Sequence, residues 1–204
     1  IMHYGDSQIE MDRISSLLRQ RLQEQFGGIG AGIVPPIQTI PSFSVSQSYV
    51  GGLQRYVVYG DTSQPRAPHR RYGLLATFAQ LYSNATINVG SSNYKQAQKN
   101  SKTFQVIQLI VGNNKAGFTA SCKGKTHTIQ GDRRGVTVLK WEFPEPVSRV
   151  SLTLNGTAEI YGVSMSGKNG VTVSNVPMRG CSGTIFTRID STTLDQSYEQ
   201  LNVA

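Results

Sequence analysis

Charged residues, cysteine and long apolar runs are all scarce in this 204-residue chain. Asp, Glu, Lys and Arg together make up 16% of it. No apolar run approaches the roughly 20 residues of a membrane-spanning helix, so we expect no membrane span. The two cysteines, Cys122 and Cys181, lie far apart and lack the spacing of metal ligands. We therefore predict no metal site, and we expect no bound cofactor.

Acidic residues are fewer than basic residues. The chain has 12 Asp and Glu and 20 Lys and Arg, which gives a net charge of +8. Such an excess can favour an anionic partner. The densest basic groups lie at residues 66–71 and 123–125, and no nucleic-acid-binding motif surrounds them. We interpret them as solvated loops and expect no nucleic-acid partner. Nucleic-acid binding is left as a third hypothesis that rests on charge alone.

The chain begins with a short apolar run that stops at Gly5-Asp6-Ser7. Apolar positions then recur at helical spacing from Asp12 to Phe26, which predicts an amphipathic helix. Ser7 is expected on a tight strand-to-helix turn, where glycine permits a sharp backbone and helix N–H groups could hold an oxyanion. Gly-Asp-Ser is also common in ordinary turns and helix caps. The apolar positions are Ile14, Leu17, Leu18, Leu22 and Phe26, with Arg13, Arg19, Gln20, Arg21 and Gln23 on the other side.

A change of period follows the helix. The Gly-rich residues 27–32 end it, and the prolines within residues 33–41 predict an extended connector. Alternating patterns then predict about ten short strands, which favour an antiparallel sandwich over residues 43–166. Asn155-Gly156 is a strong hairpin signal between the last two strands. The expected strands are 43–45, 53–59, 72–82, 85–89, 103–111, 117–121, 126–130, 135–143, 147–154 and 158–165.

The last part of the chain returns to the earlier pattern. Residues 170–176 indicate a strand, and residues 180–183 a turn. Ser191 or Thr192 is expected to cap a short helix through Leu201, with Leu194, Tyr198 and Leu201 on one face. Because strand, turn and helix succeed one another as in residues 1–26, the predicted fold class is α/β plus all-β. An antiparallel β-sandwich, residues 43–166, would be inserted into an α/β domain formed by residues 1–42 and 167–204.

The two turns carry a resemblance. Gly5-Asp6-Ser7 and Asn175-Val176-Pro177-Met178-Arg179-Gly180 are similar, in order and context, to two blocks of the SGNH (GDSL) hydrolase family. The resemblance implies a flavodoxin-like α/β domain in which Ser7 is the nucleophile and the backbone N–H groups of Ser7 and Gly180 are oxyanion donors. Gly5, Asp6 and Asn175 would support them.

The insertion extends the resemblance to architecture. A β-sandwich between the two blocks is similar to bacterial carbohydrate O-acetylesterases of this family, including those that act on O-acetylated peptidoglycan. This implies an O-acylated glycan as substrate and a periplasmic or secreted location. The oligomeric state is left open.

Two further blocks of the family are missing. The Gly-x-Asn-Asp segment that supplies a side-chain oxyanion donor is absent, and so is the Asp-x-x-His segment that supplies the acid and base. The histidines are His3, His69 and His127, and none follows an Asp by three residues. We expect surface or packing roles for all three. The sequence is therefore expected to be truncated, with the base outside it, and to hold a catalytic half-site.

The alternative hypothesis is a non-catalytic carbohydrate-binding β-sandwich protein. Aromatic side chains could supply stacking surfaces and Asn or Gln side chains hydrogen bonds. Trp141 alternates within residues 138–143 in a way that suits burial instead. The candidate stacking residues are Tyr49, Tyr56, Tyr59, Tyr72, Tyr82 and Trp141.

Overall fold

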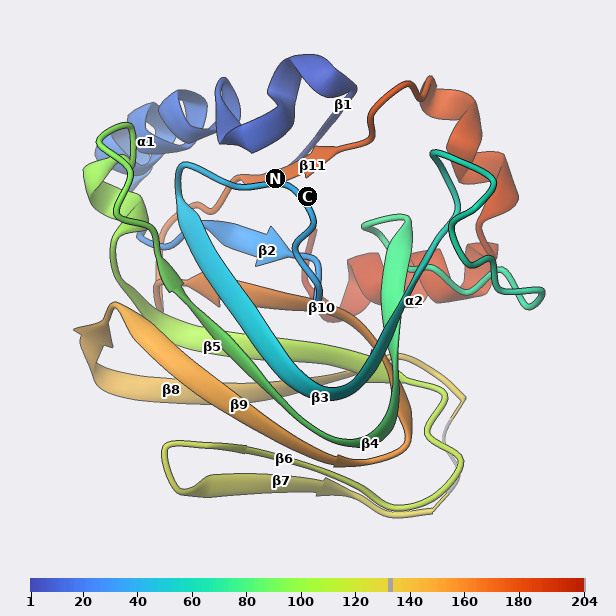
Figure 1. Cartoon of the computed structure of the whole chain (residues 1–204). Coiled ribbons are helices and arrows are strands. Elements are labelled where there is room, and N and C mark those ends of the chain that lie inside the picture. The colour runs from blue at the N-terminus through green and yellow to red at the C-terminus, as the bar shows by residue number, and fades with distance from the viewer. Residues whose placement is uncertain (132–133, 204) are drawn as a thin grey trace.

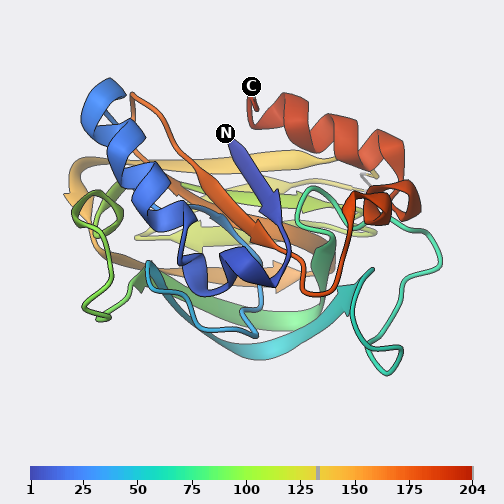
Figure 2. The ribbon, with the colours of Figure 1, turned by 90° about the horizontal axis from the view of Figure 1, so that it is seen from above.

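The fold is mostly β with few helices. The computed structural model describes residues 1–131 and 134–203. Its strands form a nine-stranded sheet and a separate two-stranded parallel sheet. The large sheet makes up the lower body of the molecule, and the helices lie along its upper part (Figure 1). Seen from above, the parallel pair and helix α1 lie over the large sheet (Figure 2). In the described residues no helix is long and apolar enough to cross a bilayer.

Helices and strands alternate at the two ends of the chain, and the middle consists of strands with one short 3₁₀ helix in the described residues. They are β1 (Met2–Gly5), the 3₁₀ helix η1 (Ser7–Asp12), α1 (Ser15–Phe26), β2 (Gly32–Val34), β3 (Val45–Val57), β4 (Thr77–Ser91), η2 (Lys99–Ser101), β5 (Phe104–Gly112), β6 (Phe118–Cys122), β7 (Lys125–Ile129), β8 (Thr137–Val147), β9 (Arg149–Gly156), β10 (Ala158–Ser166), β11 (Ser174–Pro177), η3 (Gly183–Arg188) and α2 (Ser191–Gln200). Neither η3 nor the strand β2 in the connector was expected from the sequence.

The large sheet is antiparallel, as predicted. Its strand order is β7-β6-β9-β4-β10-β5-β8, with β3 paired to β4 and β2 paired to β10. Strand β4 pairs with β10 through residues 79–81 and with β9 through residues 85–90. Strand β4 therefore joins the part of the sheet that contains β9 to the part that contains β10. Strands β2 to β10 form one continuous, nearly closed sheet by hydrogen bonding, where the sequence predicted a sandwich.

Two long strands correct the expected spacing. Strands β3 and β4 each run through a segment that had been interpreted as a turn between two short strands. The predicted hairpin at Asn155-Gly156 is wrong, because β9 and β10 do not pair with each other but follow one another along the same edge of β4. Gly156 makes the bend at a φ of 108°, and a Cβ there would lie 2.4 Å from the carbonyl oxygen of Gly117. Only glycine fits this position.

The protein has two apolar cores, and strands β5 and β10 contribute side chains to both. The larger core fills the space inside the bent sheet and includes Ile107 and Leu152, which are both 0% exposed. The second packs the sheet against residues 72–78, β11 and α2. Trp141 of β8 is 2% exposed, and its indole N–H donates to the Lys125 carbonyl of β7 at 2.9 Å. The expected burial of Trp141 is confirmed, and the ring links the two end strands of the sheet.

Helix α1 buries the face that the sequence assigned to solvent. Arg19 and Gln23 are 1% and 2% exposed, whereas Leu17 and Phe26 are 52% and 61% exposed. The polar face is buried because it finds partners: Arg19 pairs with Asp12, and Gln23 donates to two backbone carbonyls. Hydrogen-bonded polar groups can be buried without the usual penalty. The helix also begins at Ser15 rather than Asp12, since Asp12 has a φ of 65°.

The inverted helix makes a testable prediction. Leu17→Gln is expected to change the free energy of unfolding by less than about 0.5 kcal/mol, because Leu17 is half-exposed. Gln23→Ala is expected to cost about 1–2 kcal/mol, since it leaves buried carbonyl groups without a donor. Urea denaturation of the 204-residue chain measures both. The reverse order of the two effects would show that the apolar face is the one buried.

The predicted C-terminal helix is confirmed, but its cap is not. Asp190 caps α2, and its carboxylate accepts the Thr193 N–H at 2.8 Å. Ser191 and Thr192, the expected caps, lie inside the first turn. The expected apolar face packs on the second core through Leu194, Tyr198 and Leu201.

Candidate active site

The two predicted turns lie at the same end of the parallel sheet. Strands β1 and β11 pair in parallel, with Gly5 opposite Pro177. The chain leaves both strands there, and the Met178 N–H donates to the Gly5 carbonyl at 2.8 Å. The carboxyl ends of parallel strands are where open α/β sheets bind their ligands. The structure thus brings together the Ser7 turn and the turn that contains Gly180.

The Ser7 turn opens a short helix. Asp6 caps η1, and its side chain accepts the Gln8 N–H at 2.8 Å. Ser7 is the first residue of η1, is half-buried, and its Oγ has no hydrogen bond to any residue that the structure describes. Arg13 donates to the Ser7 carbonyl oxygen at 2.6 Å, which fixes the backbone of the turn.

The helix after Ser7 is not the one expected. Ser7 was predicted to precede the amphipathic helix directly, but η1 is interrupted at Glu10 and Met11, which have non-helical backbone angles. Helix α1 starts only at Ser15. A six-residue, interrupted 3₁₀ helix has little of the dipole of a regular α-helix. Any oxyanion stabilisation at Ser7 therefore depends on individual N–H groups.

The two glycines of the turns serve different purposes. Gly5 does not adopt a left-handed backbone; a Cβ there would instead lie 3.0 Å from the Ile9 side chain, which folds back over the turn. Gly180 does adopt a left-handed φ of 68°, and no atom lies within 4 Å of the position of its missing Cβ. In the described part of the chain, the Gly180 N–H donates to no backbone carbonyl. Its predicted role as an oxyanion donor stays a prediction.

Asn175 supports the Ser7 turn from below. Its side-chain amide donates to the Ile9 carbonyl at 3.0 Å, and its Oδ1 accepts the Ser15 hydroxyl at 2.8 Å. The Ser15 hydroxyl is also 2.8 Å from His3 Nδ1. One side chain on β11 therefore fixes both the end of the turn and the start of α1. Its supporting role in a catalytic site stays a prediction.

An ion pair that was not predicted joins the two turns. The Glu10 carboxylate accepts two hydrogen bonds from the Arg179 guanidinium, at 2.8 and 2.5 Å. The Glu10 side chain is 7% exposed and Arg179 is 69% exposed. Hydrogen bonding to Glu10 raises the pKa of Arg179 above its ordinary value. The signal in the sequence is the opposite charge in two turns expected to be neighbours.

None of the histidines pairs with Ser7. His3 contacts Ser15, and His127 lies 2.9 Å from the Lys140 carbonyl oxygen. His69 Nε2 is 3.0 Å from the carboxylate of Glu159, but burial outweighs that charge and lowers the pKa of His69. In residues 1–131 and 134–203, no group of three or more His, Cys, Asp and Glu side chains is arranged to hold a metal.

Comparison of structures finds a similar fold, whereas comparison of sequences finds no match. No protein-family model and no curated protein matches the sequence. A solved peptidoglycan O-acetylesterase superposes on 94% of this chain with a TM-score of 0.69 and 19% identity. The chain shares the fold of that esterase. It spans 50% of the esterase's length.

A second solved structure is more distant. It is a family two carbohydrate esterase from Cellvibrio japonicus, which matches 63% of this chain and 36% of its own length at a TM-score of 0.32 and 7% identity. That similarity is too weak to support an argument about this chain.

Proposed function

We propose that this chain is part of a serine ester hydrolase of the SGNH type that removes O-acetyl groups from a bacterial cell-envelope or dietary glycan. Ser7 Oγ attacks the ester carbonyl, and its proton passes to a base. The oxyanion accepts hydrogen bonds from the N–H groups of Ser7 and Gly180. The ester C–O bond then breaks, the glycan hydroxyl leaves with the proton from the base, and water hydrolyses the acetyl-enzyme to acetate and free Ser7. Gly5, Asp6 and Asn175 hold the turn in place.

One observation carries this proposal: the Ser7 and Gly180 turns leave neighbouring parallel strands at the same end. They are 173 positions apart in the numbering (180 minus 7), so only the fold makes them neighbours. The shared fold with a peptidoglycan O-acetylesterase supports the same reaction class. The Glu10–Arg179 ion pair would keep the two turns in register during the reaction.

We place the base and its acid partner in a segment outside these 204 residues. Strand β1 pairs only with β11 among the described strands, and the apolar face of α1 has no cover there. Both features suit further strands and helices packing against this side. The division into an α/β part, residues 1–42 and 167–204, and an insertion, residues 43–166, is part of the proposal. Strand β2 links the two parts, since it pairs with β10. A periplasmic or secreted location belongs to the same proposal.

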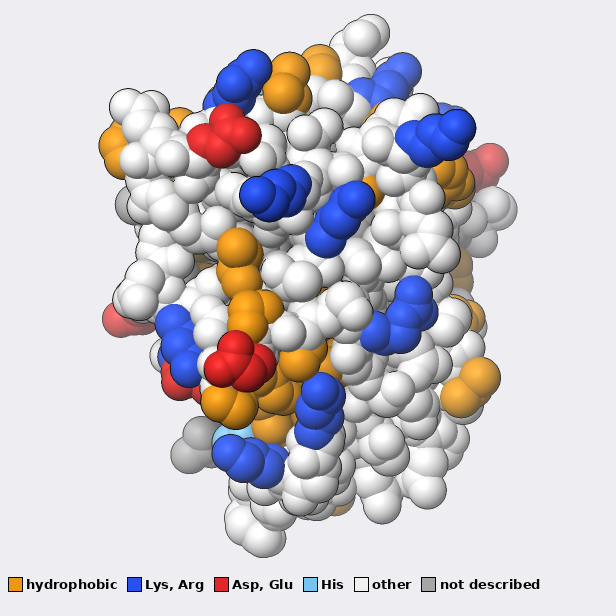
Figure 3. All heavy atoms as spheres, turned by 90° about the vertical axis from the view of Figure 1, so that its left-hand side faces the viewer, with side chains coloured by type: hydrophobic (Ala, Val, Ile, Leu, Met, Phe, Trp, Pro, Cys, Tyr) orange, Lys and Arg blue, Asp and Glu red, His pale blue; other side chains and the backbone are white. Residues whose placement is uncertain are grey.

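The absence of a base near Ser7 in the described residues favours one alternative, a non-catalytic carbohydrate-binding protein. Tyr72 and Trp141 cannot serve as stacking surfaces, because each is 2% exposed. Tyr49 and Tyr82 are 42% and 58% exposed and can. On the face shown in Figure 3, Lys and Arg side chains are dispersed and do not gather into a patch that would suit a nucleic acid.

A fluorophosphonate probe tests the proposal. In the complete protein, meaning this chain together with the segment that supplies the base, Ser7 Oγ should attack phosphorus and displace fluoride. Mass spectrometry of the peptide that contains Ser7 would then show the adduct. The 204-residue chain alone should react far more slowly, because it lacks a base to accept the proton. Labelling of a different serine, or none in the complete protein, would contradict the assignment.

A further inference from the structure

A groove of about 570 Å³ opens between the connector that follows β2 and the loop that follows β4. Its volume lies within the roughly 300–1,000 Å³ range of ligand sites. Not one of its lining residues is charged. The lining combines amides, hydroxyl groups and a tyrosine ring, among them Gln38, Ser42, Gln47, Asn93 and Tyr94.

Tyr94 is held at the wall of this groove with much of its ring in solvent. It is 45% exposed, and its ring meets the Phe43 ring edge-on, with centroids 5.6 Å apart. Ser92 fixes the loop, because its hydroxyl donates to the Phe43 carbonyl and lies 3.4 Å from the Tyr94 nitrogen. An exposed aromatic ring that neighbouring groups hold in place loses little entropy when a ligand stacks on it.

The groove lies beside the candidate active site. A narrower crevice shares Gln38, Ser42 and Val45 with it and extends to Asn175 and Pro177. Pro177 lies opposite Gly5 in the parallel sheet, two residues before Ser7. The crevice holds only about 70 Å³ and buried side chains such as Asp12 and Arg19 line it, so it is too small to take a polymer, and the groove borders the Ser7 turn without opening into it.

We propose that this groove binds uncharged sugar residues of a polysaccharide, with Tyr94 stacking on the apolar face of a sugar ring. The amides of Gln38 and Asn93 would hydrogen-bond hydroxyl or acetamido groups. A sugar ring has an apolar face with hydroxyl groups around its edge. The lining of the groove is complementary to it, because it combines one aromatic surface with uncharged hydrogen-bond donors and acceptors. As a subsite of an esterase the groove rests on the proposed function. Sugar binding itself does not need the reaction.

An extended peptide is the less favoured occupant. Strand β3 pairs only with β4 among the described strands, so its other edge could in principle accept a peptide strand. At the groove, however, the connector lies against that edge, and Gln47 donates to the Pro35 carbonyl at 2.9 Å. A peptide would have to displace this contact.

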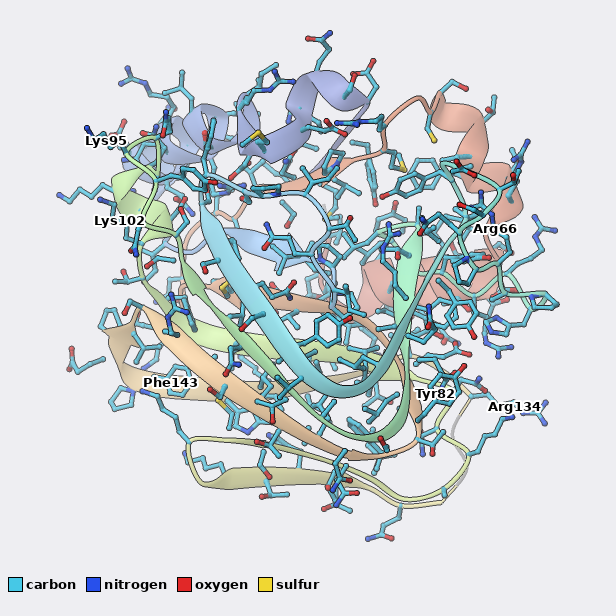
Figure 4. The ribbon with its side chains drawn as sticks, viewed as in Figure 1. Arg66, Tyr82, Lys95, Lys102, Arg134 and Phe143 are labelled. Atoms are coloured by element: carbon cyan, nitrogen blue, oxygen red, sulfur yellow. The ribbon has the colours of Figure 1, made fainter. Side chains whose placement is uncertain are left out.

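The test is calorimetric titration of the 204-residue chain with chitohexaose, a neutral oligosaccharide. Tyr94→Ala is expected to raise the Kd by about tenfold or more, and Tyr94→Phe, which keeps the ring, by less than about threefold. Phe26→Ala is the matched control, because Phe26 is an aromatic residue that is 61% exposed and does not line the groove, so its loss should leave the Kd unchanged. Lys95, next to Tyr94, lies at the upper left margin of the molecule (Figure 4).

The outcomes separate this proposal from the esterase. Ser7→Ala should bind chitohexaose as the wild type does, so a protein without esterase activity can still support the groove. No binding, equal binding by wild type and Tyr94→Ala, or binding of an alanine-rich peptide in place of the sugar would overturn it. If Tyr94→Ala does not fold, as judged by circular dichroism, Gln38→Ala and Asn93→Ala carry the test, each with an expected rise of about threefold or more.

Discussion

Replacing Ser7 with alanine in the complete protein is expected to lower kcat/KM for p-nitrophenyl acetate by a factor of about 10³ or more. The substitution removes the attacking oxygen but leaves the N–H groups of the turn. It should change the fold little, because Ser7 Oγ makes no hydrogen bond to a described residue. The residual rate would then come from oxyanion stabilisation without a nucleophile. Acetate release, measured at equal protein concentration, is the readout.

Ser63→Ala is the matched control for this experiment. Ser63 is an exposed serine in the loop between β3 and β4, and its loss should not alter the rate. Equal rates for the wild type and Ser7→Ala would remove Ser7 from the mechanism. A fall in both variants would point to a general effect on folding.

The paired turns could be predicted because their signals are local. A short strand that stops at Gly-Asp-Ser and an Asn-x-x-x-x-Gly turn after a second strand need no knowledge of the sheet between them. Strands β1 and β11, which pair in parallel, are each followed by a turn and a helix, and this succession is visible in the local sequence. Strand identity was equally accessible from residue 103 onward, where β6, β8 and β9 alternate between more and less buried residues over most of their length.

Longer strands were harder to predict, because their interruptions resemble turns. Gly51-Gly52 of β3 and Ser83-Asn84 of β4 read as turn residues, yet they lie opposite each other where the sheet bends. The register shifts between Gly51 and Leu53, and Gly51 has a φ of 101°. A bulge and a turn use the same residue types, so only pairing with a neighbour distinguishes them.

Burial of α1 depended on partners that no local pattern reveals. Helical periodicity identifies an apolar and a polar face, but it does not predict which face will find hydrogen-bond partners in the folded protein. The partners of Arg19 come from residues 12, 44, 101 and 173, which the fold alone assembles. The Glu10–Arg179 pair was missed for the same reason, since its members are 169 positions apart.

Arg19→Met is expected to lower the free energy of unfolding by about 3–5 kcal/mol, the cost of leaving a buried charge without its partner. Arg19 is 1% exposed and donates to both carboxylate oxygens of Asp12, at 2.8 and 3.0 Å. It also donates to the Val173 carbonyl at 2.5 Å, just before β11. Without the guanidinium, the Asp12 carboxylate stays buried and unpaired. Urea denaturation of the 204-residue chain measures the loss.

Two further variants make this prediction specific. Arg21→Met on the same helix should cost less than about 0.5 kcal/mol, because Arg21 is 75% exposed and its pair with Glu24 is solvated. Adding Asp12→Asn to Arg19→Met removes the orphaned charge and should restore part of the lost stability. A cost below about 1 kcal/mol for Arg19→Met would mean that water replaces the guanidinium. Ser7 and Asp12 are the first and last residues of η1, so loss of stability at Asp12 should also slow fluorophosphonate labelling of Ser7. If Arg19 acts only through the fold, the double variant should regain labelling in the complete protein together with stability.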